Sequence, residues 1–329
     1  MGIADRPLAW GVLSTARIGA RLVEGARKTG AADIVAVASR NEPSAQRFAE
    51  ANGIPRAHSS YEALLADPDI EAVYIPLPNS MHVDWTLRAL EAGKHVLCEK
   101  PMDRRPEQVA RAFDVADERD LVLSEAFMWR HNPQTTRLRA LLDEGAIGDV
   151  RLIRACFSFM LSSDGDVRLE PELDGGALMD VGCYAVSGAR LVAGGEPLSV
   201  AAEVVTGQTG VDMRLTGLLR FDGDVLAIVD CGFDLPSRGE LEICGSEGRI
   251  VLPDPWHCID PKIVVERGYE QEVVAAQGAD SYSLELEDMA AAIRGERPAL
   301  LGREDALGQA RAIEALYCSA AEGHAVPVG

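Results

Sequence analysis

The chain has 329 residues, 47% of them hydrophobic and 26% charged, a composition typical of soluble globular proteins with roughly two domains at this length. Its formal net charge of −20 argues against nucleic acid and against an anionic membrane surface as partners, because phosphate groups are bound by basic surfaces. No apolar run approaches the roughly 20 residues that span a bilayer, and no signal-peptide pattern opens the chain, so neither membrane insertion nor export is expected.

The first 125 residues alternate short apolar segments with segments of helical periodicity. Apolar strands that alternate with helices form a parallel sheet covered on both faces, with right-handed crossovers. Residues 1–125 are therefore predicted to form a doubly wound α/β domain. Strands are expected at 8–13, 33–39, 71–78, 95–101 and 121–127, and helices at 16–28, 42–53, 80–93 and 106–119.

From residue 150 onward the pattern changes to successive strands. Asp222-Gly223 is a typical hairpin turn, and a second tight turn is expected in CGSEGRI (244–250). Residues 126–329 are therefore predicted to form an α+β domain with a large, mainly antiparallel sheet, after a boundary within residues 125–150. Strands are expected at 150–161, 198–207, 213–221, 225–233, 239–252 and 263–268, and helices at 176–192, 283–294 and 303–321.

The cysteines and histidines show no metal-binding pattern. The seven cysteines are odd in number and none has CxxC spacing, which indicates reduced thiols and a cytoplasmic protein rather than disulfides or a zinc site. The six histidines are scattered along the chain, so no metal is expected.

The first strand runs into the turn GVLSTARIGA (11–20). A β-α-β unit that opens in this way commonly binds a pyrophosphate at the helix N-terminus, with the fingerprint G-x-G-x-x-G. This chain has Ser14-x-Ala16-x-x-Gly19, so small residues replace two of the three glycines, and a tight turn without a ligand is the alternative. The candidate cofactor-binding residues of the turn are Ser14, Thr15, Ala16, Arg17 and Ile18.

The second strand ends in Ser39-Arg40-Asn41, where NAD-preferring sites carry an acid for the ribose 2′-hydroxyl. A serine hydroxyl and an arginine suit a 2′-phosphate instead, through charge-assisted hydrogen bonds. Ser39 and Arg40 therefore favour NADP(H), with NAD(H) as the alternative cofactor. The competing interpretation is that Arg40 is a solvated residue at the start of a loop.

Two further loops follow strands of the same sheet, where ligands bind outside the carboxyl ends. The segment YIPLPNSMH (74–82) is placed to line a cofactor or only to make a turn, and its candidate residues are Pro76, Leu77, Asn79 and His82. In HVLCEKPMD (95–103), Lys100 is expected to point into the nicotinamide crevice, and a cis bond to Pro101 is compatible with the sequence. Glu99 is expected to contact a ribose or amide of the cofactor.

In GGALMDVGCYAVSGARLV (175–192), Asp180 and Tyr184 are four residues apart and would share one face of a helix. With a lysine nearby they would form a proton-handling set, because an ammonium stabilises a phenolate. The alternative is a charge near a helix N-terminus and a half-buried aromatic ring.

The order of these motifs resembles the glucose–fructose oxidoreductase / inositol dehydrogenase / MocA (Gfo/Idh/MocA) family. A β-α-β turn is followed by Glu-Lys-Pro after a later strand, and then by GGAL-x-D-x-G-x-Y in the second domain. The segment SEAFMWRHNPQ (124–134) and the Ser-Ala form of the turn are similar to a subgroup, the dimeric dihydrodiol dehydrogenases and NADP-dependent D-xylose dehydrogenases. The resemblance implies an N-terminal Rossmann domain and a C-terminal open sheet that commonly supports a homodimer or homotetramer.

The resemblance also implies roles for single residues. It places Lys100 beside the nicotinamide and the substrate hydroxyl, makes Tyr184 the acid/base, and gives Asp180 the task of binding substrate and orienting the pair. Trp129 and Arg130 lie in a loop that often borders the active site.

The function favoured is an NADP(H)-dependent oxidoreductase acting on a secondary-alcohol or hemiacetal carbon of a sugar or cyclic diol. A keto-sugar reductase of the same family is the first alternative. A non-catalytic dinucleotide-binding regulator is the second, although it would not need the pair Lys100 and Tyr184.

Overall fold

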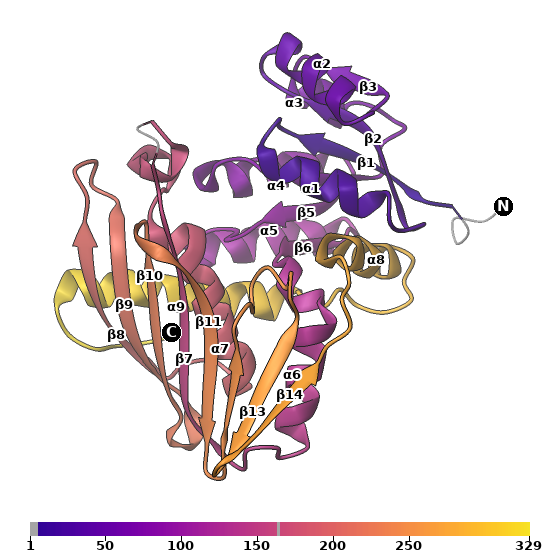
Figure 1. Cartoon of the computed structure of the whole chain (residues 1–329). Coiled ribbons are helices and arrows are strands. Elements are labelled where there is room, and N and C mark those ends of the chain that lie inside the picture. Colours follow the sequence, from indigo (N-terminus) through magenta and orange to yellow (C-terminus); the bar gives the residue numbers. More distant parts are fainter. Residues whose placement is uncertain (1–5, 163–164) are drawn as a thin grey trace. The chain divides into compact units, whose positions relative to one another are not determined.

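The computed structural model describes residues 6–162 and 165–329, and the chain divides into two compact units (Figure 1). The first unit comprises the chain up to Asp103 together with Glu107–His131 and Asp280–Leu307. The second unit comprises Arg104–Pro106, Asn132–Ala279 and Gly308–Gly329. The chain therefore passes from one unit to the other more than once.

A parallel sheet forms the first unit, with six strands in the order β3-β2-β1-β4-β5-β6. The chain builds the sheet outward from β1 in one direction and then from β4 in the other, and ligands of such sheets bind beyond the carboxyl ends at this switch point. The predicted doubly wound sheet is confirmed. Its strands are β1 (Leu8–Leu13), β2 (Ala32–Ala38), β3 (Arg56–His58), β4 (Ala72–Ile75), β5 (His95–Glu99) and β6 (Leu123–Ala126).

The helices that follow these strands agree with the sequence-based prediction, with one exception. Strand β3 and helix α3 have three and five residues, which is too short to show a periodicity, and neither was predicted. The helices between the strands are α1 (Arg17–Ala26), α2 (Glu42–Ala51), α3 (Tyr61–Leu65), α4 (His82–Glu91) and α5 (Pro106–Glu118), with 3₁₀ turns η2 (Asn79–Met81) and η3 (Met128–His131).

Helix α8 (Ser281–Ile293) comes from late in the sequence and completes the core of the first unit. It packs closely on α1 because Gly25 has no side chain: a Cβ there would lie 2.7 Å from the Cβ of Tyr282. Leu286 of α8 and Leu22 of α1 are both 0% exposed and belong to one buried cluster. Burying each such side chain stabilises the fold by about 1.5–3 kcal/mol.

The second unit is built on nine strands in the order β14-β13-β12-β11-β7-β10-β9-β8-β15. Neighbouring strands are antiparallel except for the parallel pair β7 and β10, so the predicted mainly antiparallel sheet is confirmed. The strands are β7 (Val150–Met160), β8 (Ser199–Thr206), β9 (Asp212–Arg220), β10 (Leu226–Gly232), β11 (Asp234–Gly245), β12 (Arg249–Leu252), β13 (Lys262–Arg267), β14 (Glu270–Ala275) and β15 (Val326–Pro327).

Both predicted turns of this sheet are present. The Asp222-Gly223 turn joins β9 to β10, and the second turn, closed by a hydrogen bond from Gly245 N to Gly248 O, joins β11 to β12. Strands β14 and β15 were not predicted, because β14 is mostly exposed and β15 has two residues, so neither shows an apolar alternation.

The second unit also carries helices. The π-helical turn η6 continues into α7, which packs against β7, β10 and β11 (Figure 1). The remaining elements outside the sheets are η4 (Val167–Leu169), η5 (Pro171–Leu173), η6 (Leu178–Gly182), η7 (Asp222–Asp224), α6 (Pro133–Asp143), α7 (Cys183–Ala193) and α9 (Arg303–Glu322). Helix α9 belongs to the first unit up to Leu307 and to the second from Gly308 onward.

The division of the chain into two domains at residue 125 stays a prediction. The compact units show in addition that a late segment of the chain belongs to the first unit. Asp280–Leu307 belong to the first unit, because α8 buries its apolar side chains in the core around α1. A helical pattern shows which face is apolar but does not show which partner covers it. None of the helices in residues 6–162 and 165–329 has the length and apolar character needed to cross a membrane.

Candidate active site

The turn from β1 to α1 is built around Ser14, where the dinucleotide fingerprint has its first glycine. Ser14 has a φ of 151°, in the region that favours glycine, and is 7% exposed. Its Oγ accepts from Ala16 N at 3.1 Å and donates to Pro76 O at 2.9 Å. The Ser14 side chain therefore joins two of the segments predicted to bind the cofactor.

Helix α1 begins directly after this turn, and the N–H of its third residue, Gly19, donates to Ala16 O at 3.0 Å. Ala16 is the N-cap in an extended conformation and makes no side-chain hydrogen bond, and the first turn holds no acidic residue. Thr15, Ala16 and Ile18 are partly exposed and Arg17 is exposed. Such an N-terminus favours an anion through its N–H groups and the helix dipole.

Ser39 and Arg40 follow β2 directly. Ser39 is 8% exposed, its Oγ accepts from Asn41 N at 3.2 Å, and its own N–H donates to His58 O at 3.2 Å. Arg40 is exposed, and its guanidinium opposes the rise in the pKa of Tyr61 that burial causes. Ser39 and Arg40 are therefore consecutive at the carboxyl end of β2, and a hydroxyl and a guanidinium are groups that suit a phosphate.

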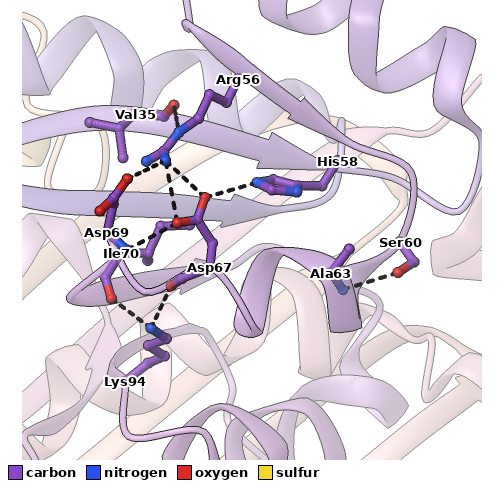
Figure 2. A network of polar contacts seen from close by, with 9 residues as sticks. All are labelled: Val35, Arg56, His58, Ser60, Ala63, Asp67, Asp69, Ile70 and Lys94. Carbon is purple, nitrogen blue, oxygen red and sulfur yellow. Dashed lines mark hydrogen bonds and ion pairs between the residues drawn. The ribbon is translucent and has the colours of Figure 1, made fainter.

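A network of polar contacts centred on Asp67 holds β3 next to the segment that follows β2 (Figure 2). The Asp67 side chain is 8% exposed and pairs through Oδ2 with Arg56 at 3.0 Å and with His58 at 3.2 Å. The Lys94 ammonium donates to the main-chain oxygen of Asp67 at 2.8 Å. Because His58 O accepts the N–H of Ser39, the network also supports the loop that carries Arg40.

The β4 loop and the Glu-Lys-Pro loop are tied together by His82. The ring is 1% exposed, with Nδ1 2.9 Å from Pro101 O and Nε2 2.8 Å from Leu77 O. Burial lowers the pKa of His82, and the two carbonyl contacts oppose that shift. His82 thus fixes the two loops from inside, while Pro76 is buried and Asn79 is partly exposed in η2.

Strand β5 ends at Glu99, whose carboxylate is held by the protein. The hydroxyl of Tyr74 donates to Oε1, and the main-chain N–H of Lys100 donates to Oε2 at 3.2 Å. Burial raises the pKa of Tyr74, and the charge of Glu99 adds to the rise. Lys100 is partly exposed, and its peptide bond to Pro101 is cis.

Trp129 and Arg130 lie in η3. Trp129 is 0% exposed, and Arg130 pairs with Asp305 at 3.2 Å while its guanidinium lies 5.7 Å from the Trp129 ring centroid. These contacts are within the first unit, and contact of either residue with a cofactor stays a prediction.

A buried acid on α8 adds to the polar groups around Glu99. Glu285 is 1% exposed, its carboxyl lies 4.0 Å from Nε2 of His131, and neither oxygen has a hydrogen-bond partner among the residues described. Burial raises the pKa of Glu285 well above its usual range, and the nearby charge of Glu99 adds to the rise. Burial lowers the pKa of His131 to about 4.

In the second unit, Asp180 lies in the π-helical turn η6, a local geometry that is frequent at functional sites. Arg168 donates from Nε to Oδ2 of Asp180 at 2.7 Å, and its NH1 pairs with Asp166 at 3.1 Å. The Asp180 side chain is 20% exposed. The guanidinium therefore orients the carboxylate while leaving part of it accessible to solvent.

Tyr184 is partly exposed and stands in a cluster of rings. Its ring centroid lies 5.4 Å from Phe157 and 6.0 Å from Trp256, and His257 lies 5.4 Å from Phe157. The predicted spacing of Asp180 and Tyr184 assumed a regular α-helix. The structure instead has the π turn up to Gly182 before α7, and the shared face of the two side chains stays a prediction.

Two family descriptions match the chain. Residues 8–127 match the oxidoreductase family with an NAD-binding Rossmann fold, and residues 135–251 match the GFO/IDH/MocA C-terminal domain. The chain belongs to the Gfo/Idh/MocA oxidoreductase family. The predicted family, enzyme class and fold are thereby confirmed.

Three relatives with named activities are similar to this chain over most of their length. A D-xylose 1-dehydrogenase (NADP(+)) from Haloferax volcanii is 40% identical, over 97% of this chain and 99% of the relative. A trans-1,2-dihydrobenzene-1,2-diol dehydrogenase from Xenopus tropicalis is 36% identical over 80% of each chain. The crystal structure of a 3-ketoreductase from Actinomadura kijaniata in complex with NADP and TDP-benzene is 32% identical, with a TM-score of 0.90 over 95% of this chain and 98% of that one.

Several residues that contact the candidate site residues were not singled out from the sequence. Arg168 is the only basic residue in the acidic segment DGDVRLEPELD (164–174), a signal that could have been noticed. Tyr74 and Phe157 lie in apolar strands and looked like core residues. Within the described part of the chain, no group of three or more His, Cys, Asp or Glu side chains is placed to hold a metal ion.

Proposed function

We propose that this protein is an NADP(H)-dependent oxidoreductase that transfers hydride between the nicotinamide and a secondary-alcohol or hemiacetal carbon of a sugar or cyclic diol. The reaction would be of the aldose 1-dehydrogenase or dihydrodiol dehydrogenase type. The observation that carries the proposal is the Asp180 carboxylate, oriented by Arg168 in a π turn that leads to the partly exposed Tyr184. The names of the similar xylose and dihydrodiol dehydrogenases support it.

The residues of the first unit fit NADP(H). The uncapped N-terminus of α1 suits a pyrophosphate, and Ser39 with the exposed Arg40 suits a 2′-phosphate. Lys100 and Glu99 at the end of β5 would face the nicotinamide ribose and ring. The NADP(+) dependence in the name of the Haloferax volcanii relative supports the same preference.

NADP(H), when bound, supplies or accepts the hydride. In the proposed reaction the Tyr184 phenol gives or takes the proton of the substrate hydroxyl. The Lys100 ammonium stabilises the negative charge that develops on the substrate oxygen, and an ammonium also lowers the pKa of a nearby phenol. Asp180 accepts a hydrogen bond from a substrate hydroxyl, and Arg168 keeps its carboxylate in one orientation.

A keto-sugar reductase is the second candidate, because two relatives carry that chemistry in their names. One is the 3-ketoreductase from Actinomadura kijaniata. The other is a dTDP-3,4-didehydro-2,6-dideoxy-α-D-glucose 3-reductase from Streptomyces violaceoruber, 41% identical over 73% of this chain and 72% of the relative. The same proposed residues would serve reduction, with Tyr184 donating its proton.

The proposal includes a homodimer or homotetramer formed through the second sheet, in the cytoplasm. The outer face of β8, β9 and β10 carries exposed apolar side chains, including Val205 (47%), Leu218 (45%) and Leu226 (39%), and such a patch favours association. Reduced thiols, expected from the cysteine pattern, support the location. Sedimentation equilibrium of the wild type and of Leu218→Asp would test the interface.

The activity is tested by turnover of NADP⁺ or NADPH with aldoses, inositols, 1,5-anhydrosugars, dihydrodiols and keto-sugars. We expect Lys100→Ala and Tyr184→Phe each to lower kcat on the best substrate by about 10²–10⁴-fold. Lys28→Ala, which removes an exposed lysine paired with Asp280 at 2.5 Å, is the control. Wild-type rates in Lys100→Ala would refute the assignment, and NADPH binding without turnover of any substrate would indicate a regulator.

A further inference from the structure

The segment that leads into the π turn is held from a neighbouring strand by Asp212, the first residue of β9. Asp212 is 6% exposed, and its Oδ2 accepts the main-chain N–H of Leu178 at 2.7 Å. Leu178 is the first residue of η6, so this carboxylate satisfies a helix-terminal N–H that has no partner within the helix. Asp212 thereby acts as an N-terminal cap supplied by another element.

The second oxygen of Asp212 is also occupied. Tyr317 of α9 donates its hydroxyl to Oδ1 at 2.8 Å, and the Arg104 guanidinium lies 5.4 Å from the centroid of the Tyr317 ring. Burial raises the pKa of Asp212, and the hydrogen bonds from Leu178 and Tyr317 oppose that rise. Two donors on two oxygens leave the carboxylate a single orientation.

The glycine before the turn is explained by this contact. Gly176 has a φ of +126°, and a Cβ on it would lie 2.0 Å from Oδ1 of Asp212. Its carbonyl accepts the N–H of Asp180 at 3.0 Å, and its own N–H donates to Arg168 O at 2.9 Å. The segment is therefore held on one side by Asp212 and on the other by Arg168, which pairs with the Asp180 carboxylate.

We propose that Asp212, oriented by Tyr317, is a positioning residue for Asp180: it fixes the first residues of the π turn so that the Asp180 carboxylate stays on Arg168 in the orientation that receives the substrate. Asp212 itself touches neither substrate nor cofactor in this proposal. The inference rests on the proposed function, since Asp180 is taken as the substrate-binding carboxylate. It adds a residue that no motif of the family resemblance pointed to.

The test compares Asp212→Ala with Asp212→Asn. Asparagine keeps both bonds, because its oxygen accepts from Leu178 and its amide can donate to the Tyr317 oxygen, so Asp212→Asn should keep a rate close to wild type. Asp212→Ala should lose about tenfold to a hundredfold in kcat, as displaced substrate-binding groups do. The Kd for NADPH, measured by fluorescence, should not change in either variant.

The matched control is Asp288→Ala, which removes another buried aspartate (2% exposed) that accepts a main-chain N–H, from Leu300 at 2.9 Å. It should lower thermal stability and leave kcat unchanged. If Asp212→Ala does not fold, Tyr317→Phe takes its place, because it removes one bond and keeps the ring; kcat should then fall by a smaller factor.

A second readout separates this inference from the proposed function. Hydrogen–deuterium exchange over residues 176–184 should accelerate in Asp212→Ala and Tyr317→Phe and stay at the wild-type level in Asp212→Asn. Failure of the wild type to turn over any substrate would refute the proposed function, and exchange alone would then decide whether Asp212 fixes the turn. Wild-type exchange and wild-type kcat in both Asp212→Ala and Tyr317→Phe would overturn the inference, as would loss of activity in Asp212→Asn equal to that in Asp212→Ala.

Discussion

Arg168 and Asp180 form a 2.7 Å ion pair between the Nε of one side chain and the Oδ2 of the other, within the second unit. The contact fixes one oxygen of a carboxylate that is only 20% exposed. A hydrogen bond from a charged donor to a charged acceptor is directional as well as strong. Substituting Arg168 therefore tests whether the fixed orientation of the Asp180 carboxylate contributes to turnover of the substrate.

We expect Arg168→Met to lower kcat/KM for the best sugar or diol by about tenfold to a hundredfold, the usual value of a lost charged hydrogen bond. Arg168→Lys should recover part of the loss, because an ammonium keeps the charge without the guanidinium's two-sided contact. Arg220→Met, which breaks an exposed ion pair with Asp224 at 3.0 Å, is the control. Equal kcat/KM values in Arg168→Met and Arg220→Met would contradict the role.

Arg40 should decide between the two nicotinamide cofactors. Its exposed guanidinium is the group that we propose to bind the 2′-phosphate, which NADH lacks, so Arg40→Ala should raise the Kd for NADPH by about tenfold or more and leave that for NADH unchanged. Calorimetric titration with each cofactor measures both constants. Arg47→Ala removes an exposed arginine of α2 and should change neither, and an equal loss for NADPH and NADH in Arg40→Ala would argue against a phosphate contact.

The contact between α1 and α8 should be sensitive to a single methyl group. In Gly25→Ala the new Cβ would lie 2.7 Å from the Tyr282 Cβ and 2.9 Å from the Ser283 N, so the helices must separate. We expect the free energy of unfolding to fall by about 1–3 kcal/mol, in spite of the better helix propensity of alanine. Urea titration measures it, and Gly30→Ala, whose Cβ would meet no described heavy atom within 4 Å, should be near neutral.

Glu285 should make the stability fall as the pH rises. The pKa of Glu285 is raised in the folded state, so the folded protein keeps a proton that the unfolded chain releases. The free energy of unfolding therefore falls as the pH rises from the unfolded pKa toward the folded pKa. Glu285→Gln cannot titrate, so relative to wild type it should gain up to about 1.4 kcal/mol per pH unit as the pH rises above the ordinary glutamate pKa of about 4.3.

Urea unfolding at several pH values measures this difference. The lowered pKa of His131 makes the stability rise with pH, but only below the ordinary histidine pKa of about 6.5. It therefore does not affect the difference between Glu285→Gln and wild type above neutral pH. Glu287→Gln, the same change at an exposed position of α8, is the control. A pH-independent difference between Glu285→Gln and wild type would show that the carboxyl is ionised in the fold.

The strands and the motifs were predictable because their signals are local. The apolar run at 33–39 and the Asp222-Gly223 turn each carry their own pattern, and Lys100 is conspicuous at the end of an apolar strand. The contacts of Asp180 were not predictable in the same way. Arg168 lies 12 residues earlier, and it reaches Asp180 only because the chain folds back through the intervening glycines.

Asp212 and α8 show a second reason why some contacts could not be predicted from the sequence. Asp212 looks like any acid at the start of a strand, and it becomes a cap only when β9 lies beside the π turn. The apolar face of α8 is visible in the sequence, but its partner α1 lies more than 250 residues earlier, and the choice of partner depends on the whole first unit. Long-range pairings of this kind follow from three-dimensional packing, not from periodicity.

The return of α8 to the first unit has a consequence for recombination among relatives. A chimaera joined at residue 125 would combine the α1 of one parent with the α8 of the other, and Gly25 would then face a foreign Tyr282 position. A graft of the cofactor-binding half must therefore transfer Asp280–Leu307 as well. The gene reads as two consecutive modules, but the smallest exchangeable block is discontinuous.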